Sequence, residues 1–491
     1  MKRRVYLNEY NVPMGNAIYL PYASGLLQAY AQNNPEVRGM YEFMPILFQR
    51  DTVENIIAQY DSPAVAGFSV SIWNYELSCA VAREVKRLWP ECIIVFGGPS
   101  VGEDLSFVDH MVRGEGEKAF LNILLGVDDV AEPEKDIDNY PSPYVSGVFD
   151  GIMADNPHLE FQAIIETTRG CPYSCVFCFW GHQGGLYKKF RRHGFMYICA
   201  EAGWIGVHKI KYIFVSDSNF GVMKEDIETA KIYADVNESY GYPEKVRVCY
   251  GKTAQDSIFE TAKVLSEAGL AKAVTLSSQS YHEPTLKAIH RDNIKKEIIE
   301  SMYERYHKAG IPTYSEFILG LPEENSSSFS SGINRALERM KGNKLFIYQC
   351  TVLPNTRLAD PEYQRRYGIK TVRVPLKEVH ASVRADNMVV EYEDIVIGTD
   401  AMSVGEYVQC LAWAWQVQFR LLAKFPVLLG KSYVALAREV VKGKSRCQHD
   451  PKFGDIYWEP EEFFYLQAME HKVGDIKQFA IEKVLYGRKG K

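Results

Sequence analysis

Short apolar runs and helical patterns alternate through residues 1–135. Ala64–Ile72 (AVAGFSVSI) is a nearly continuous run of apolar and small residues, as in a strand buried within a parallel sheet. Apolar residues recur at helical spacing over Glu76–Leu88, and Cys92–Phe96 (CIIVF) predicts the next strand. This order predicts an α/β domain built on a doubly wound, Rossmann-like parallel sheet.

A second alternation of strands and helices begins after residues 136–158, which are rich in Asp, Pro and Gly and which we interpret as a linker. Six strand-like runs separated by helical patterns predict a partial (β/α)6 barrel over residues 159–374. Its functional site should lie at the carboxyl ends of the strands. The predicted strands are 161–167, 210–215, 245–250, 272–276, 312–319 and 344–351.

The remaining residues, 375–491, predict a mainly helical region that caps the active site. Glu406–Phe425 is apolar on nearly every face, which is typical of a buried helix. We expect this helix to close the barrel mouth, and the alternative is that its Trp413 lines a substrate pocket. Tyr348 and Gln349 on the sixth strand are further candidates for the pocket wall.

The composition is typical of a globular protein. Of 491 residues 46% are hydrophobic and 24% are charged, and the net charge is -6. This acidic balance argues against a broad nucleic-acid interface. No apolar run reaches the ~18 residues of a membrane span, and the start, MKRRVYLNEYNVP, lacks the apolar segment of a secretory signal. The expected location is the cytoplasm.

Three of the ten cysteines, Cys171, Cys175 and Cys178, cluster in TTRGCPYSCVFCFWG after the first predicted barrel strand. In a reducing compartment such a triplet indicates metal or cluster chemistry. Three thiols on one helix face would have the same spacing, but Gly170 and Pro172 favour an irregular loop. Structural zinc usually takes four ligands in paired C-x₂-C knuckles. A four-iron cluster held by three thiolates would leave one iron open to a small chelating ligand.

The stretch CPYSCVFC resembles the C-x₃-C-x-aromatic-C signature of the radical S-adenosylmethionine (SAM) enzymes. The resemblance implies a [4Fe-4S] cluster whose open iron binds SAM, which is cleaved to a radical that abstracts hydrogen from an unactivated carbon. Three later stretches also resemble the family, namely VSDSNFG (215–221), SSQS (277–280) and EFILGLPEEN (316–325). The implied SAM contacts are Phe177, Asp217, Gln279, Ser280, Arg291 and Glu316.

Some of these residues have simpler alternatives. Asp217 could cap a helix at 224–236, Arg291 could form a surface ion pair, and Phe177 could be ordinary core. The stretch 316–325 also departs from the family pattern, because Glu323 replaces Gly and Asn325 replaces Thr. Loss of Gly disfavours a turn with positive φ at that position.

The N-terminal domain resembles the cobalamin-binding domain of the cobalamin-dependent branch of the family. The resemblance rests on GFSVSIWN (67–74), GGPS (97–100) and RGEGE (113–117), in that order before the linker. Small residues there would let the backbone approach a large ring and its nucleotide tail. The implied contacts are Ser69, Ser71, Ile72, Trp73, Asn74, Gly97, Gly98, Pro99, Gly114, Glu115 and Gly116.

The D-x-H-x-x-G motif, which supplies a histidine ligand to cobalt in many cobalamin proteins, is missing. Asp109 and His110 are adjacent, which is the wrong spacing. We therefore expect cobalamin to bind with its own base displaced and with no histidine beneath the cobalt. Trp73 is the candidate to cover that face.

The resemblance as a whole implies a methyltransferase that moves a methyl group from methylcobalamin to an unactivated carbon of a small-molecule or peptide substrate. An electron donor such as flavodoxin or ferredoxin would reduce the cluster. One alternative is a cobalamin-dependent radical SAM enzyme that rearranges or cyclises its substrate. A methylthiotransferase would carry three further N-terminal cysteines, whereas only Cys79 and Cys92 precede residue 170. A non-enzymatic cobalamin- or cluster-binding sensor is the last alternative.

Overall fold

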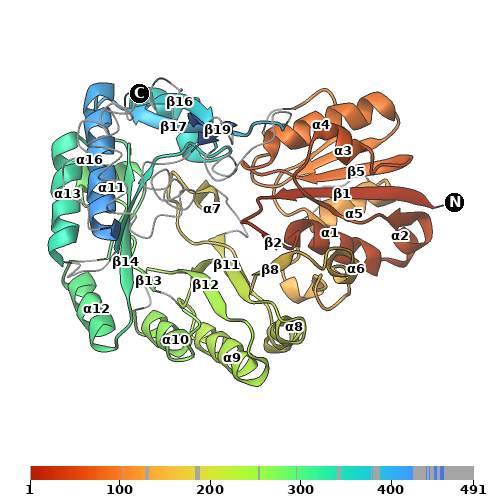
Figure 1. The fold of residues 1–491 in the computed structure, drawn as a ribbon, viewed down its shortest axis with the longest axis horizontal. Helices are drawn as coiled ribbons and strands as arrows, with labels where there is room; N and C mark the ends of the chain where they lie inside the picture. Colours follow the sequence, from red (N-terminus) through yellow and green to blue (C-terminus); the bar gives the residue numbers. More distant parts are fainter. Residues whose placement is uncertain are drawn as a thin grey trace.

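A computed structural model describes residues 2–102, 104–127, 132–182, 188–252, 255–271, 273–294, 296–339, 344–376, 388–423, 447–450 and 454–457, with 379, 438 and 442. Parallel strands alternate with helices through residues 1–135, the N-terminal region, and 159–374, the middle region (Figure 1). The predicted α/β class is therefore confirmed. No helix among the described residues has the length and apolarity needed to cross a bilayer.

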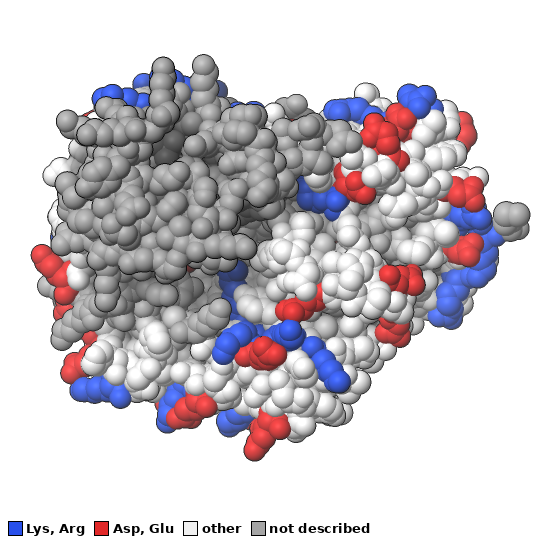
Figure 2. Space-filling view, viewed as in Figure 1, with Lys and Arg blue, Asp and Glu red and all other residues white. Residues whose placement is uncertain are grey.

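Charged side chains of both signs are mixed on the surface. Figure 2 shows Lys and Arg interspersed with Asp and Glu over the visible face of the described residues. On that face the described residues offer no broad basic area of the kind that holds nucleic acid.

Six parallel strands form the sheet of the N-terminal region: β1 (Arg3–Asn11), β3 (Tyr41–Phe43), β4 (Leu47–Gln49), β5 (Pro63–Ser69), β6 (Ile93–Gly97) and β7 (His110–Val112). Their order is β3-β1-β5-β6-β7, and β4 also pairs with β1. The accompanying helices are α1 (Tyr22–Asn33), α2 (Pro35–Met40), α3 (Val53–Ile57), α4 (Tyr75–Leu88) and α5 (Glu117–Leu125).

Helices cover both faces of this sheet. Val5 and Val65 belong to a core that includes α1 and α5, whereas their neighbours Tyr6 and Ala66 belong to a core that includes α3 and α4. Successive side chains of a strand point to opposite faces, so a strand buried on both faces is apolar throughout. This is why Ala64–Ile72 shows a continuous apolar run.

All six strands predicted for the middle region are present, and each pairs in parallel with at least one other of them. They are β8 (Glu160–Ile165), β11 (Tyr212–Phe220), β12 (Lys245–Tyr250), β13 (Val274–Thr275), β14 (Thr313–Leu319) and β15 (Lys344–Gln349). They form two sheets, β12-β11-β8-β2 and β13-β14-β15, and β12 also contacts β13. Helices follow as α8 (Phe195–Val207), α9 (Glu225–Tyr240), α10 (Gln255–Glu267), α11 (Glu283–Ala288), α12 (Lys296–Lys308) and α13 (Ser326–Arg339).

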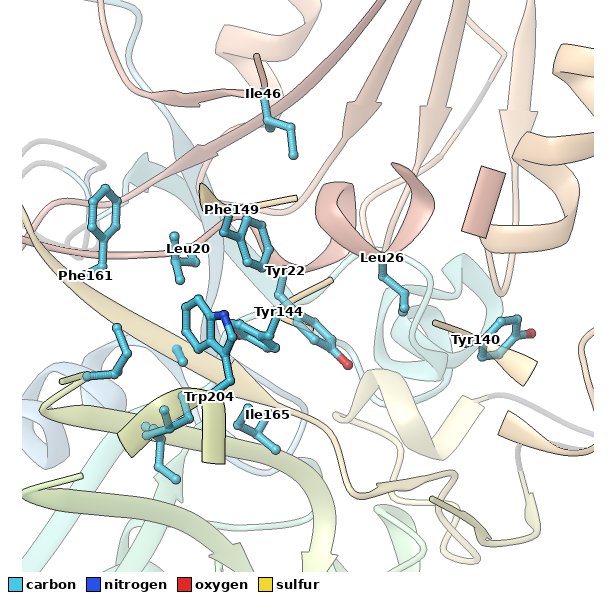
Figure 3. Close-up of a cluster of buried hydrophobic side chains, with 14 of the residues drawn as sticks. Leu20, Tyr22, Leu26, Ile46, Tyr140, Tyr144, Phe149, Phe161, Ile165 and Trp204 are labelled. Atoms are coloured by element: carbon cyan, nitrogen blue, oxygen red, sulfur yellow. The ribbon is translucent and has the colours of Figure 1, made fainter. Parts of the chain in front are cut away.

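The two regions share one hydrophobic core. Strand β2 (Ala17–Tyr19) belongs to the N-terminal region in sequence, but it pairs with β8 of the middle region and not with the N-terminal sheet. Residues 136–158, which contain η1 (Ile137–Asn139) and α6 (Asp150–Asp155), pack at the same place. The ring of Tyr144 lies 4.9 Å from that of Trp204 in α8 and 5.1 Å from that of Phe149. Figure 3 shows these rings beside Tyr22 of α1.

The end of the middle region and the C-terminal region, 375–491, contain strands that the sequence analysis did not anticipate. β16 (Lys370–Pro375) and β17 (Tyr392–Gly398) pair antiparallel, as do β18 (Cys447–Asp450) and β19 (Gly454–Tyr457). The predicted long helix is present as α16 (Val404–Ala423). It packs beside α13 against β14 and β15 (Figure 1), and its Tyr407 accepts a hydrogen bond from Gln349, the last residue of β15. That this helix closes the barrel mouth stays a prediction. Most of residues 424–491 lie outside the described residues, so a mainly helical character there stays a prediction.

Candidate functional site

The three clustered cysteines lie in an irregular loop, residues 170–178, which we call the cysteine loop. It runs from β9 (Thr168–Arg169) to α7 (Phe179–His182) and contains no helix, so the interpretation of three thiols on one helix face is wrong. Gly170 has φ +112°, a conformation that favours glycine. Cys171 and Cys175 are each 7% exposed, and Cys178 is half-buried. The loop thus brings three reduced thiols into the interior.

Polar side chains from neighbouring strands hold this loop. Ser218 of β11 donates to the carbonyl of Gly170 at 2.5 Å, and Asn219 Nδ2 lies 3.3 Å from Cys171 Sγ. Lys252, just after β12, has its Nζ 3.8 Å from Cys175 Sγ, and burial lowers its pKa to about 8. The sequence analysis missed Ser218, Asn219 and Lys252, although each lies near the carboxyl end of a barrel strand, where functional groups were expected.

No group of three or more His, Cys, Asp or Glu side chains in the described part of the chain could hold a single metal ion. This does not bear on a four-iron cluster, in which each thiolate binds a separate iron. The donor set of the cysteine loop, three thiols and no carboxylate, has the chemistry of a cluster site.

Asp217 anchors the strand that precedes the cysteine loop. Its Oδ1 accepts from the N–H groups of Thr167 (2.7 Å) and Thr168 (3.0 Å), and its Oδ2 accepts from the Thr167 hydroxyl. Burial raises the pKa of Asp217 to about 7. The alternative of a helix cap is wrong, because Asp226 accepts the N–H groups of Gly221 and Met223 before α9. Both oxygens of Asp217 are therefore engaged within the protein.

Glu316 of β14 comes together with Gln279 and Arg291 beyond the carboxyl end of β13. Ser277 donates to the carboxylate of Glu316, and the N–H of Gln279 donates to the carbonyl of Glu316 at 2.9 Å. Arg291 Nη2 donates to the carbonyl of Ser277 at 2.6 Å. Because Arg291 is 6% exposed, its interpretation as a surface ion pair is wrong. Phe177 packs against a separate buried cluster that contains Leu286.

The loop after β14 adopts a turn that its sequence disfavours. Glu323 has φ +65°, so the positive-φ turn forms although glycine is absent. The loop therefore keeps the turn that the loss of glycine disfavours, with Glu323 in the left-handed region. The next residue, Glu324, is 2% exposed, and its Oε1 accepts from the Ser280 hydroxyl at 2.5 Å. Burial raises the pKa of Glu324 to about 8.

A cavity of about 300 Å³ lies between the carboxyl end of the N-terminal sheet and the middle region. Phe179 and Trp180 of α7 and Ser216 of β11 line it on the side of the middle region. The predicted residues that line it are Ser69, Gly97, Gly98, Gly114, Glu115 and Gly116. Gly98 has φ +109°, and a Cβ there would lie 2.6 Å from the Val70 carbonyl oxygen, so only glycine fits.

The other predicted cobalamin contacts shape the neighbouring turns. Asn74 Oδ1 accepts from the N–H of Ser71 at 2.8 Å, and its Nδ2 donates to the carbonyl of Ser69 at 3.0 Å. Ile72 is half-buried in this turn, and Trp73 is 39% exposed. The carbonyl of Pro99 accepts from Asn355, which follows β15, at 2.9 Å.

A buried ionic network lies beside the cavity. Arg169, the residue before Gly170, contacts Glu115 (2.9 Å), Glu117 (2.9 Å) and Glu166 (2.6 Å). Arg191 also bonds Glu115. All five side chains are at most 11% exposed. Burial raises the pKa of Glu117, whereas for Glu115 the two arginines outweigh burial and lower the pKa. The predicted ligand contact Glu115 thus directs its carboxylate at arginines of the middle region.

A second buried pair ties the C-terminal region to the N-terminal region. Arg50 lies 3.1 Å from Glu391, with side chains 4% and 0% exposed. The carboxylate of Glu391 also accepts from the N–H groups of Glu76 (2.8 Å) and Leu77 (3.1 Å) at the start of α4. Arg50 further donates to the carbonyl of Trp73 at 2.7 Å, which fixes the turn that carries this tryptophan.

The three predicted substrate-pocket residues do not share one surface. Tyr348 is 51% exposed and its ring stacks on Phe346, which in turn meets Tyr314 of β14 edge-on. Gln349, the next residue on the strand, donates to the hydroxyl of Tyr407 in α16 at 3.1 Å. Trp413 packs edge-on against Phe329 of α13. Tyr348 therefore lies with Phe346 and Tyr314 on the strand face opposite to Gln349. Trp413 belongs to the outer layer of helices.

The chain is similar to known proteins over most of its length. A model of the Radical SAM superfamily matches residues 165–336. The chain is 35% identical over 437 residues to 2-(S-pantetheinyl)-carbapenam-3-carboxylate methyltransferase of Streptantibioticus cattleyicolor, covering 82% of this chain and 64% of that protein. It is 32% identical over 452 residues to the cobalamin-dependent radical SAM methyltransferase TokK of Streptomyces tokunonensis, covering 85% and 65%. The chain thus spans less than two thirds of either relative.

The fold is similar to that of a solved structure, the radical SAM methyltransferase TsrM from Kitasatospora setae with cobalamin and a [4Fe-4S] cluster bound. The TM-score is 0.59 at 15% identity, over 90% of this chain and 100% of that chain. At this identity the likeness concerns the fold alone.

Proposed function

We propose, from the match of residues 165–336 to the Radical SAM superfamily, that the chain is a cobalamin-dependent radical SAM methyltransferase. Its substrate would be a small molecule or peptide that is methylated at an unactivated carbon. The observation that carries the proposal is the juxtaposition of the cysteine loop and the glycine-lined cavity. Arg169, just before the loop, and Phe179 and Trp180, just after it, line that cavity. The names of the relatives, one a cobalamin-dependent radical SAM methyltransferase, support the same conclusion.

Each region has a part in this proposal. Residues 1–135 would bind cobalamin, 159–374 would form the partial (β/α)6 barrel, and 375–491 would complete the active site. Residues 136–158 connect the first two. The fold likeness to TsrM supports this division, as do the parallel strand orders of the two regions.

The cluster would be held by Cys171, Cys175 and Cys178. Three thiols bind three irons and leave the fourth without a protein ligand. Gln279, Arg291 and Glu316 at the ends of β13 and β14 are the candidates to hold SAM. When bound, the cluster, SAM and cobalamin would together supply hydrogen abstraction and methyl transfer. The chain's own contribution is to bind and orient these groups and to exclude water from them.

Cobalamin would lie in the cavity with its nucleotide tail against Gly97 and Gly98. Trp73 is the candidate to cover the lower face of the corrin ring. His110 begins β7 and so lies at the amino end of that strand, whereas the cavity lies at the carboxyl ends. The cob(II)alamin form of the protein should show no nitrogen superhyperfine splitting from a histidine in its EPR spectrum. Clear splitting would contradict this assignment.

The decisive experiment is anaerobic reconstitution of the full chain with iron, sulfide and cobalamin. We expect uptake of about four irons and one corrinoid, and formation of 5′-deoxyadenosine when SAM and a strong reductant are added. Replacing all three cysteines by alanine should abolish iron binding. Protein that stays colourless, or a triple variant that keeps its iron, would refute the proposal. With a substrate in hand, a product without an added methyl group would identify a rearrangement or cyclisation instead.

The aromatic residues Tyr314, Phe346 and Tyr348 are the candidates for the substrate wall. Their rings line one strand face, with centroid distances of 5.4 Å and 6.4 Å between neighbours. Such a face suits a flat or apolar substrate group. A flavodoxin- or ferredoxin-like donor would supply the electron in the cell.

A further inference from the structure

Asn219 and Lys252 direct their side-chain nitrogens at the sulfurs of two different cysteines. Asn219 Nδ2 lies 3.3 Å from Cys171 Sγ, and Lys252 Nζ lies 3.8 Å from Cys175 Sγ. Reduction of an iron–sulfur cluster adds negative charge that its thiolate ligands share, so hydrogen bonds to these sulfurs raise the reduction potential. We propose that Lys252, assisted by Asn219, sets the reduction potential of the cluster that the proposed function requires.

The residues around Lys252 keep its ammonium group close to Cys175 Sγ. The Nζ lies 4.6 Å from the ring centroid of Tyr173, which stands between Cys171 and Cys175 in the loop. Such a cation–π contact favours one position of the ammonium group. The N–H of Gly251 donates to the carbonyl of Phe220 at 3.0 Å, which fixes the backbone just before Lys252. The half-buried site strengthens the interaction, because a charge acts more strongly where water is partly excluded.

Lys252 is a better residue to change than Arg291, a second cation beside Cys175. Arg291 also lies against Cys175, but it is almost fully buried and bonds both the Ser277 carbonyl and the Asn293 side chain. Its replacement would disturb the end of β13 together with the charge. Lys252 makes its described polar contacts with the cysteine loop alone. The electron itself comes from an external low-potential reductant.

The test is an EPR-monitored redox titration of the reconstituted full chain without SAM. For Lys252→Met we expect one-electron reduction of the cluster to become at least tenfold less favourable, which is about 59 mV more negative. Lys252→Arg should restore most of the wild-type potential. Asn219→Ala should shift it in the same direction by less, since it removes a neutral donor. Lys263→Met is the matched control, because Lys263 is an exposed lysine of α10 that pairs with Glu267, and it should leave the potential unchanged.

Each possible result of this titration leads to a different conclusion about Lys252. An unchanged potential in iron-replete Lys252→Met overturns the inference, and weaker SAM binding by that variant would then assign Lys252 to SAM. If Lys252→Met does not retain its cluster, Tyr173→Leu decides, because it keeps the lysine and removes the ring that positions it. A negative shift in Tyr173→Leu and Asn219→Ala supports the inference, and no shift in either overturns it. Wild-type protein without a cluster would refute the proposed function itself.

Discussion

Replacing Arg169 by methionine should destabilise the protein more than any comparable surface change. Arg169 contacts three carboxylates, those of Glu115, Glu117 and Glu166, at 2.6–2.9 Å, and its own side chain is 9% exposed. Methionine keeps much of the volume but leaves the carboxylates with too little positive charge. Removing one partner of a buried ion pair costs about 3–5 kcal/mol. For a large domain, roughly 2 °C per kcal/mol gives a fall of about 6–10 °C in the thermal midpoint.

The assay is differential scanning fluorimetry of the apo protein under reducing, anaerobic conditions. Arg305→Met is the matched control, because Arg305 also contacts two carboxylates, those of Asp256 and Glu260, but its side chain is 39% exposed. Its two exposed pairs contribute at most about 1 kcal/mol each, so its midpoint should fall by no more than about 4 °C. Arg169→Lys should be intermediate, because one ammonium group cannot reach three carboxylates as the guanidinium fork does. Equal shifts for Arg169→Met and Arg305→Met would refute the reasoning.

Three further changes test other parts of the structure. Glu324 has a pKa raised by burial from 4.5 to about 8, so in that window the folded state holds a proton that the unfolded chain has lost. Stability should fall as pH rises through the window, and Glu324→Gln should flatten the slope by up to about 1.4 kcal/mol per pH unit, measured by urea midpoints at several pH values. Glu323→Gly should raise the thermal midpoint, because it relieves about 1 kcal/mol of strain at φ +65°, whereas Glu323→Ala should not. Gly98→Ala, whose Cβ would lie 2.6 Å from the Val70 carbonyl oxygen, should weaken cobalamin binding at least about tenfold in equilibrium dialysis, whereas Gly102→Ala, with its nearest neighbour at 4.0 Å, should not.

The longer central strands of the parallel sheets could be predicted from the sequence, because the apolar run that marks a buried strand lies within the strand itself, whereas the short strands β3, β4 and β7 were not predicted. A central strand of a parallel sheet is covered on both faces, so it appears as a short apolar run between polar turns. The predicted runs 245–250 and 312–319 correspond to β12 (Lys245–Tyr250) and β14 (Thr313–Leu319). Strand β2 could not be found in this way. It has three residues and is defined by pairing with β8, which lies more than one hundred residues later in the chain.

The irregular conformation of the cysteine loop was predicted correctly, because Gly170 and Pro172 determine the backbone conformation at their own positions. The contacts that hold the loop were not predicted, since they join residues far apart in sequence. Glu115 illustrates the difficulty. In the sequence it belongs to a glycine-rich turn that resembles a ligand site, but in the fold its carboxylate bonds Arg169 and Arg191. A turn that approaches a ligand through its glycines can thus use its charged residue to bind another part of the protein.

The contacts between the regions favour one fixed arrangement around the cavity. An interface held by apolar contacts alone can slide with little loss of free energy, because dispersion contacts are non-directional. The interfaces between the regions also contain two buried ion pairs, Arg169 with Glu115 and Arg50 with Glu391, and an exposed hydrogen bond from Asn355 to the Pro99 carbonyl. Sliding would separate the ion pairs and leave charges buried without partners, which costs several kcal/mol for each pair. Since Glu115 lines the cavity and Arg169 precedes the cysteine loop, the same ion pair that joins the regions also sets the position of the cavity relative to the thiols.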